Sequence, residues 1–76
     1  MNTQESIIIT CLANQLDKRG AANIKILEGK HIGVDSYIIR FDYDELVFSY
    51  PVFKSYVKRY GAFMTIKNIF KELKLK

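Results

Sequence analysis

The chain has 76 residues, of which 49% are hydrophobic and 26% charged, with one proline and four glycines. A chain this apolar buries enough surface to fold, so we expect a single domain over residues 1–76 rather than a disordered segment. Its size excludes doubly wound nucleotide-binding folds and large catalytic clefts. The remaining classes are small binding, regulatory and interaction modules.

The number of cysteines and histidines and the length of the apolar runs further restrict which sites and locations the protein can have. The only cysteine, Cys11, cannot form an internal disulfide, and one histidine with one cysteine cannot complete a zinc site. We therefore expect no metal and no other cofactor. No apolar run exceeds three residues, and the first six residues include an acid and no lysine. We expect no membrane partner, no secretory signal and a cytoplasmic location.

The net charge of +4 is unevenly distributed along the chain. Residues 1–50 carry five basic and seven acidic groups, whereas residues 51–76 carry seven basic groups and one acid, Glu72. The first segment therefore has a charge of minus two and the second a charge of plus six. Such segregation attracts polyanions to one part of a protein surface.

Residues 3–19 have the pattern of an amphipathic helix. Asn2 and Glu5 resemble an N-terminal capping box, leucines follow at four-residue spacing, and Gly20 provides a stop signal. Cys11 lies in the middle of this helix among apolar neighbours, so we expect its thiol to be buried and unreactive.

Three segments then alternate between apolar and polar residues with a period of two. This alternation predicts β-strands at residues 23–28, 35–42 and 45–50. We expect residues 30–33, which glycines bracket, to form a loop, and the acidic residues 42–45 to form a tight turn. Because both connections are short, the strands are expected to be antiparallel.

Pro51 marks a change of pattern. Proline cannot donate a hydrogen bond within a sheet and suits the first turn of a helix, so we expect the sheet to end there. Apolar residues recur at helical spacing over residues 52–60, and again from Thr65 after an intervening glycine, Gly61. The sequence therefore predicts two C-terminal helices with lysines along their outer sides.

The expected fold is α+β in the order α-β-β-β-α-α, with two layers in which helices cover one face of a three-stranded antiparallel sheet. One core is expected to include four large residues: Ile39, Phe41, Phe48 and Phe70. The uncovered face is expected to carry three aliphatic residues: Leu27, Ile38 and Val47. We interpret these three as a candidate interface for a protein partner or a second copy of the chain.

The C-terminal segment carries six candidate nucleic-acid-binding residues: Lys54, Lys58, Arg59, Lys67, Lys71 and Lys74. Two tyrosines, Tyr56 and Tyr60, accompany them, and mixtures of basic and aromatic residues bind phosphates and stack on bases. Lysines also solvate ordinary amphipathic helices, so the charge asymmetry is what favours nucleic acid. Lys67 falls where a helix-turn-helix would bury a residue, which argues against a major-groove reader.

Two further groups of residues have side chains that could form a site. Asp42, Asp44 and Glu45 could ligate a divalent cation, although acids at such positions are typical of turns. His31 is the only histidine, and an imidazole can transfer a proton to or from an RNA 2′-hydroxyl near neutral pH. An exposed turn histidine without a catalytic role is the alternative interpretation.

The element order with a basic last helix resembles the double-stranded-RNA-binding fold and, within it, HicA-type toxins. These toxins are small ribonucleases of toxin–antitoxin pairs, with a Gly-Ser-His motif after the first helix and a last helix similar to Gly-Thr-Leu-Arg-x-Ile-Leu-Lys. In this chain, residues 29–31 read Gly-Lys-His and residues 64–71 read Met-Thr-Ile-Lys-Asn-Ile-Phe-Lys. The resemblance implies that His31 is catalytic.

The resemblance covers residues 3–31 and 64–76 and is partial. Lys30 replaces the motif serine and Met64 replaces the glycine, while residues 52–60 look like an insertion. We therefore favour a non-enzymatic regulatory or inhibitory module that binds nucleic acid or a protein through its basic C-terminal helices. A HicA-like metal-independent ribonuclease and a dimerisation module are the alternatives.

Overall fold

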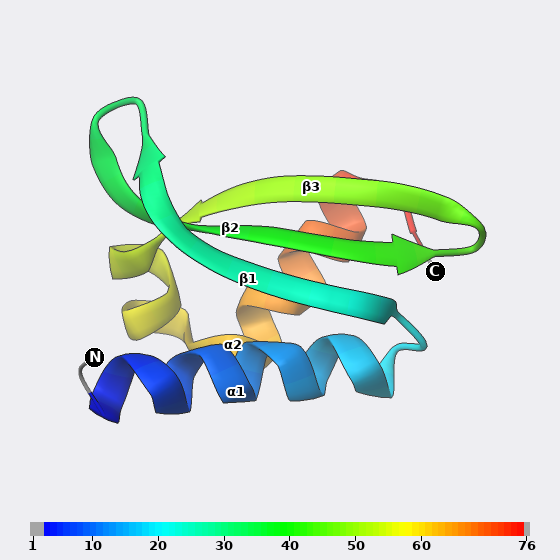
Figure 1. Ribbon diagram of the computed structural model, residues 1–76, viewed down its shortest axis with the longest axis horizontal. Coiled ribbons are helices and arrows are strands. Elements are labelled where there is room, and N and C mark those ends of the chain that lie inside the picture. The colour runs from blue at the N-terminus through cyan, green and yellow to red at the C-terminus, as the bar shows by residue number, and fades with distance from the viewer. Residues whose placement is uncertain (1–2, 76) are drawn as a thin grey trace.

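The computed structural model describes residues 3–75 (Figure 1). The elements are α1 (Thr3–Lys18), β1 (Ala22–His31), β2 (Val34–Tyr43), β3 (Leu46–Phe53) and α2 (Lys54–Glu72). The strands form one antiparallel sheet in the order β1-β2-β3. The predicted α+β class and the three-stranded antiparallel sheet are therefore confirmed. Asn2 of the predicted capping box lies outside the described residues.

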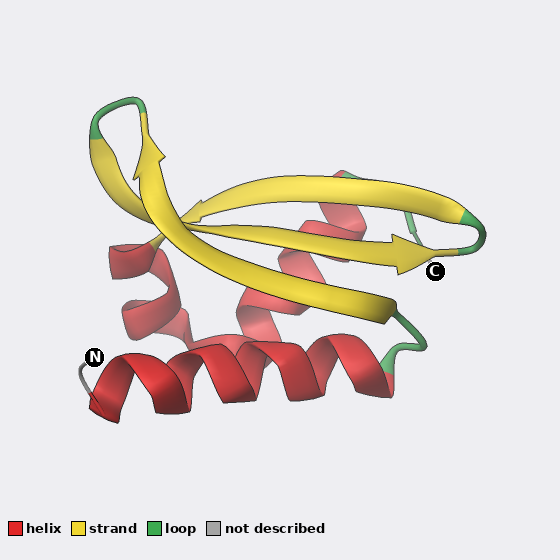
Figure 2. Ribbon diagram, in the orientation of Figure 1, coloured by secondary structure: helices red, strands yellow, loops and turns green. Residues whose placement is uncertain are grey.

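Both helices pack on the same face of the sheet, and no element of residues 3–75 covers the other face (Figure 2). The buried core joins side chains from α1, β2 and α2: Leu12, Leu16, Tyr37, Ile39, Phe41, Val57, Ile66, Ile69 and Phe70. The predicted core group is confirmed, with Phe48 half-buried and stacked on Phe41 at a ring-centroid distance of 5.5 Å. Burial of these apolar side chains is the main stabilising contribution.

The N-terminal helix ends near Gly20 as predicted, but the side chain of Cys11 points to solvent instead of to the core. Gly20 follows the last turn at φ 91°, a conformation that favours glycine, and the Ala21 amide donates to the Leu16 carbonyl at 3.1 Å. Cys11 is exposed, so its predicted burial is wrong. Consecutive helical residues point about 100° apart, and Leu12 occupies the core-facing position next to it.

Both hairpin turns are shorter than predicted. Ile32 and Gly33 form the first turn with φ values of 54° and 73°, and Asp44 and Glu45 form the second with 53° and 67°. Positive φ at both central residues matches the right-handed twist of paired strands. The expected loop at residues 30–33 is wrong in part, because Lys30 and His31 belong to β1.

The sheet does not end at Pro51 as predicted. β3 continues to Phe53, and Pro51 lies opposite Ile38 within the ladder. An edge strand tolerates proline where its missing N–H would point away from the neighbouring strand. The sequence pattern does not show which strand lies at an edge, so it placed the boundary too early.

The two predicted C-terminal helices form one helical element, α2, with a kink at Gly61. This residue has φ 84° and ψ 167°, which only glycine adopts readily. The hydroxyl of buried Thr65 donates to the Gly61 carbonyl at 2.7 Å and so satisfies an acceptor at the kink. Residues 52 and 53 belong to β3, and the residues directly after Gly61 are already helical.

Candidate functional site

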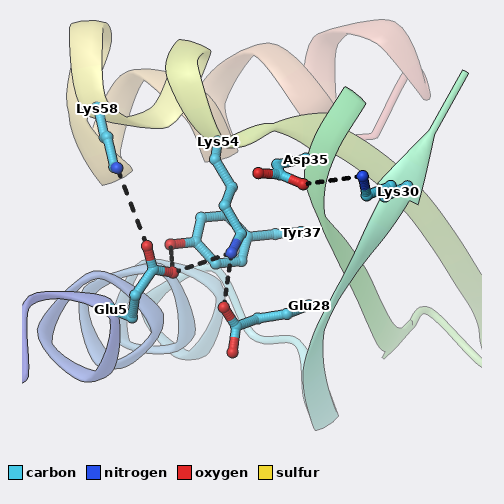
Figure 3. Close-up of polar contacts among 7 residues, drawn as sticks. All are labelled: Glu5, Glu28, Lys30, Asp35, Tyr37, Lys54 and Lys58. Carbon is cyan, nitrogen blue, oxygen red and sulfur yellow. Dashed lines mark hydrogen bonds and ion pairs between the residues drawn. The ribbon is translucent and has the colours of Figure 1, made fainter. Parts of the chain in front are cut away.

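Two of the six candidate basic residues are held in an ion-pair cluster at the start of α2 (Figure 3). The Lys54 ammonium lies 2.6 Å from Glu28 Oε1 and 3.4 Å from Glu5 Oε2, and its side chain is 19% exposed. Lys58 lies 4.0 Å from Glu5 Oε1. The positive charge of Lys54 is therefore compensated within the chain, whereas Lys58, whose side chain is 52% exposed, is paired only at its margin.

Tyr37 joins this cluster from the buried face of β2. Its hydroxyl donates to Glu5 Oε2 at 2.5 Å, and the Lys54 ammonium lies 5.2 Å from its ring centroid. The hydrogen bond from Tyr37, assisted by Lys54, lowers the pKa of Glu5. Burial and the adjacent Glu5 carboxylate raise the pKa of Tyr37, and the hydrogen bond to Glu28 raises the pKa of Lys54.

These pKa directions define what the cluster can do. Glu5 stays ionised while Tyr37 and Lys54 stay protonated near neutral pH, so none of the three is poised to exchange a proton there. The cluster connects α1, β1, β2 and α2 and acts as a structural clamp among them.

The sequence analysis did not identify this cluster. Tyr37 and Glu5 are 32 residues apart, and Lys54 and Glu28 are 26 apart, so no local pattern connects them. One signal was present: the two-residue period of β1 places Glu28 on the same face as Ile26, where a core residue is expected. An acid at such a position indicates a cationic partner.

Three of the remaining basic residues are exposed at the C-terminal end of α2. Lys67 and Lys71 are four residues apart on one side of the helix, and Lys74 lies directly after the helix ends, with φ 58°. All three are exposed, and none makes an ion pair with any residue from 3 to 75. We call these residues the lysine stripe.

Two of the three arginines, Arg19 and Arg59, contact aromatic rings rather than carboxylates. The Arg59 guanidinium lies 5.5 Å from the Tyr60 ring centroid, and that ring lies 4.7 Å from the ring of Tyr56. Arg19, at the end of α1, lies 5.0 Å from the ring of Phe70 in α2. Arg59 is exposed, so it remains accessible to an anionic ligand together with its half-exposed tyrosine.

The uncovered sheet face brings together only part of the predicted protein interface. Leu27 and Ile38 are cross-strand partners, whereas Val47 lies opposite Asp42, four positions along β2 from Ile38. Leu27 and Val47 are exposed and Ile38 is half-buried. The polar side chain of Arg40 separates the two parts of this face along β2.

His31 lies at the end of β1, opposite Val34, rather than in a turn. Its ring is half-buried, with its centroid 6.0 Å from that of Phe53, and it makes no hydrogen bond to a described residue. It borders a cleft of about 330 Å³ between the end of β3 and α2. Asn68 donates to the Tyr56 hydroxyl in the lining of this cleft.

The three acidic residues considered above as cation ligands lie in and beside the second hairpin turn. Asp42 accepts a hydrogen bond from Asn23 at 2.6 Å, while Asp44 and Glu45 form the turn itself. Residues 3–75 contain no cluster of three or more side chains suited to holding a metal ion.

Neither described helix is long and apolar enough to cross a lipid bilayer.

Comparison with protein-family models, curated proteins and solved structures found no match to this chain.

Proposed function

We propose that the protein is a non-enzymatic binding module that engages a nucleic-acid backbone through the lysine stripe of α2. The observation that carries this proposal is the contrast between the two groups of lysines. Lys54 and Lys58 have carboxylate partners, whereas Lys67, Lys71 and Lys74 are exposed and unpaired among the described residues. Their charges are free to interact with an external polyanion.

The spacing of the stripe supports an extended anionic ligand. Lys67 and Lys71 are four helical residues apart, which corresponds to about 6 Å along the helix axis, and Lys74 follows directly after the end of α2. Lysines at this spacing can contact successive charges on one chain, and each contact with a phosphate releases a condensed counterion. The affinity is therefore expected to depend steeply on salt concentration.

Fluorescence anisotropy with a labelled oligonucleotide tests the proposal. The wild type is expected to bind at 50 mM salt and to lose affinity steeply by 200 mM. The double variant Lys67→Glu/Lys71→Glu is expected to bind at least tenfold more weakly. Lys25→Glu/Arg40→Glu, which changes the net charge equally on the uncovered sheet face, is the matched control and is expected to bind far better than the stripe variant.

Two outcomes contradict this proposal. Absence of binding by the wild type at 50 mM salt would show that the stripe is only a solvated helix surface. Equal losses in the two double variants would show that net charge, rather than the position of the lysines, governs binding.

A further inference from the structure

We infer that Phe63 is a base-stacking platform and that the ligand of the lysine stripe is single-stranded nucleic acid. This inference rests on the proposed function and adds the class of nucleic acid and a residue that selects it.

The exposure of the Phe63 side chain is a feature of α2 that its basic charge does not explain. Its side chain is 56% exposed although it lies in a well-formed helix, and it does not belong to the core or to the half-buried side chains packed against it. Its ring contacts no other aromatic ring among residues 3–75. A phenylalanine with this exposure leaves a free π face directed at solvent.

The helical position of Phe63 aligns it with the lysines. It precedes Lys67 by four residues and Lys71 by eight, so the ring continues the lysine stripe toward the kink at Gly61. Ile69, which points about 160° around the helix from Lys67, lies in the core. One surface of α2 therefore presents a flat apolar ring followed by two cations, and Lys74 adds a third directly after the helix ends.

This combination distinguishes among anionic ligands. In a duplex the bases stack on one another and their faces are covered, so Phe63 would gain nothing from the bases. In a single strand each base has an accessible face that stacks on an aromatic side chain, while flanking lysines contact the backbone. A basic surface that contains one exposed ring therefore complements a single strand better than a duplex.

The test compares a labelled single-stranded oligothymidylate with a duplex of equal length. Phe63→Leu keeps an apolar side chain and removes the π face, and it is expected to weaken single-strand binding by about 5- to 100-fold, the range measured for stacking contacts. Duplex binding is expected to change less than twofold. Phe63→Trp is expected to retain or improve single-strand affinity.

The tryptophan variant supplies an independent signal, because the chain contains no tryptophan. Stacking of a base on the indole of Phe63→Trp is expected to quench its fluorescence as oligothymidylate is added. Val47→Trp is the matched control, since Val47 is 68% exposed on the uncovered sheet face. Its indole is expected to show no quenching.

The outcomes separate this inference from the proposed function. If Phe63→Leu binds both nucleic acids like the wild type, the stacking inference is wrong while backbone binding stands. If the wild type binds neither ligand at 50 mM salt, the proposed function fails as well. Binding only to vesicles of anionic lipid, with a blue shift of the Phe63→Trp indole, would overturn both in favour of a membrane surface.

Discussion

Ile32 adopts a backbone conformation that is unfavourable for its side chain. Its φ is 54°, in the left-handed region, where a β-branched residue is disfavoured by about 1–2 kcal/mol. The side chain is 82% exposed, so packing within the chain recovers little of this cost. The neighbouring Gly33 and the pairing of His31 with Val34 hold the residue in the turn.

Replacing Ile32 with asparagine is therefore expected to stabilise the protein. Asn-Gly is the preferred pair for this turn, and asparagine tolerates positive φ, so Ile32→Asn should raise the free energy of unfolding by about 1 kcal/mol. Urea denaturation followed by circular dichroism measures the change. Ile32→Val, which is also β-branched, should give no gain. A loss of stability in Ile32→Asn would show that the isoleucine side chain makes a stabilising contact.

At the scale of elements, the clamp around Tyr37 predicts a pH dependence. The folded state lowers the pKa of Glu5, so this group contributes stability above its unfolded pKa of about 4.3 and loses it as the pH falls through the lower folded value. Tyr37 and Lys54 have raised pKa values. Their contributions are complete below about pH 10 and are lost as the pH rises through the folded values.

Glu5→Gln isolates the acid side of this dependence. The amide keeps the shape of the carboxylate but cannot titrate, so the variant should be less stable at pH 7 and lose less stability than the wild type between about pH 5 and 3. Urea midpoints across this pH range provide the measurement. Glu45→Gln, in an exposed turn, should retain the wild-type profile. Parallel profiles for Glu5→Gln and the wild type would exclude the clamp as a source of acid sensitivity.

The kink in α2 divides one helical element into two parts with different surroundings. Before Gly61, Lys54 and Lys58 bind the carboxylate of Glu5, and Val57 enters the core. After Gly61, the helix changes direction (Figure 2). Phe63, Lys67 and Lys71 belong to this second part of the helix. Beyond the neighbouring residues and the adjacent helix backbone, no described atom lies within 4 Å of the position that a Cβ atom at residue 61 would occupy. Backbone conformation rather than crowding therefore favours glycine there.

At the scale of the whole molecule, the sequence predicts those features that repeat locally. The period of two residues identified all three strands, and the spacing of Leu12 and Leu16 identified α1, because one face of each element enters the core. The end of β3 was misplaced because Pro51 is tolerated only on an edge, and edges are set by the sheet as a whole.

The candidate site was predictable only in part for the same reason. The sequence showed that the C-terminal segment is basic, and it named every lysine of the stripe. It did not show that Glu28 compensates the positive charge of Lys54, because the two residues are 26 positions apart in the sequence. Phe63 was not identified either, since exposure of a large apolar residue depends on the direction that α2 takes after Gly61.

The single core makes the stability of the whole domain depend on a few aromatic residues. Phe41 is buried at a ring-centroid distance of 5.6 Å from Phe70, so it connects β2 with α2. Phe41→Ala should cost about 3–5 kcal/mol. A domain of this length is stable by about 4–11 kcal/mol, so the variant should be partly or wholly unfolded at 37 °C.

Phe48 is half-buried, and Phe48→Ala should cost less than Phe41→Ala, about 1–3 kcal/mol. Val47→Ala, in the exposed position next to it, should change stability by less than about 0.5 kcal/mol. Thermal and urea unfolding of the three variants rank these effects, and an equal cost for Phe48→Ala and Val47→Ala would show that β3 does not share the core.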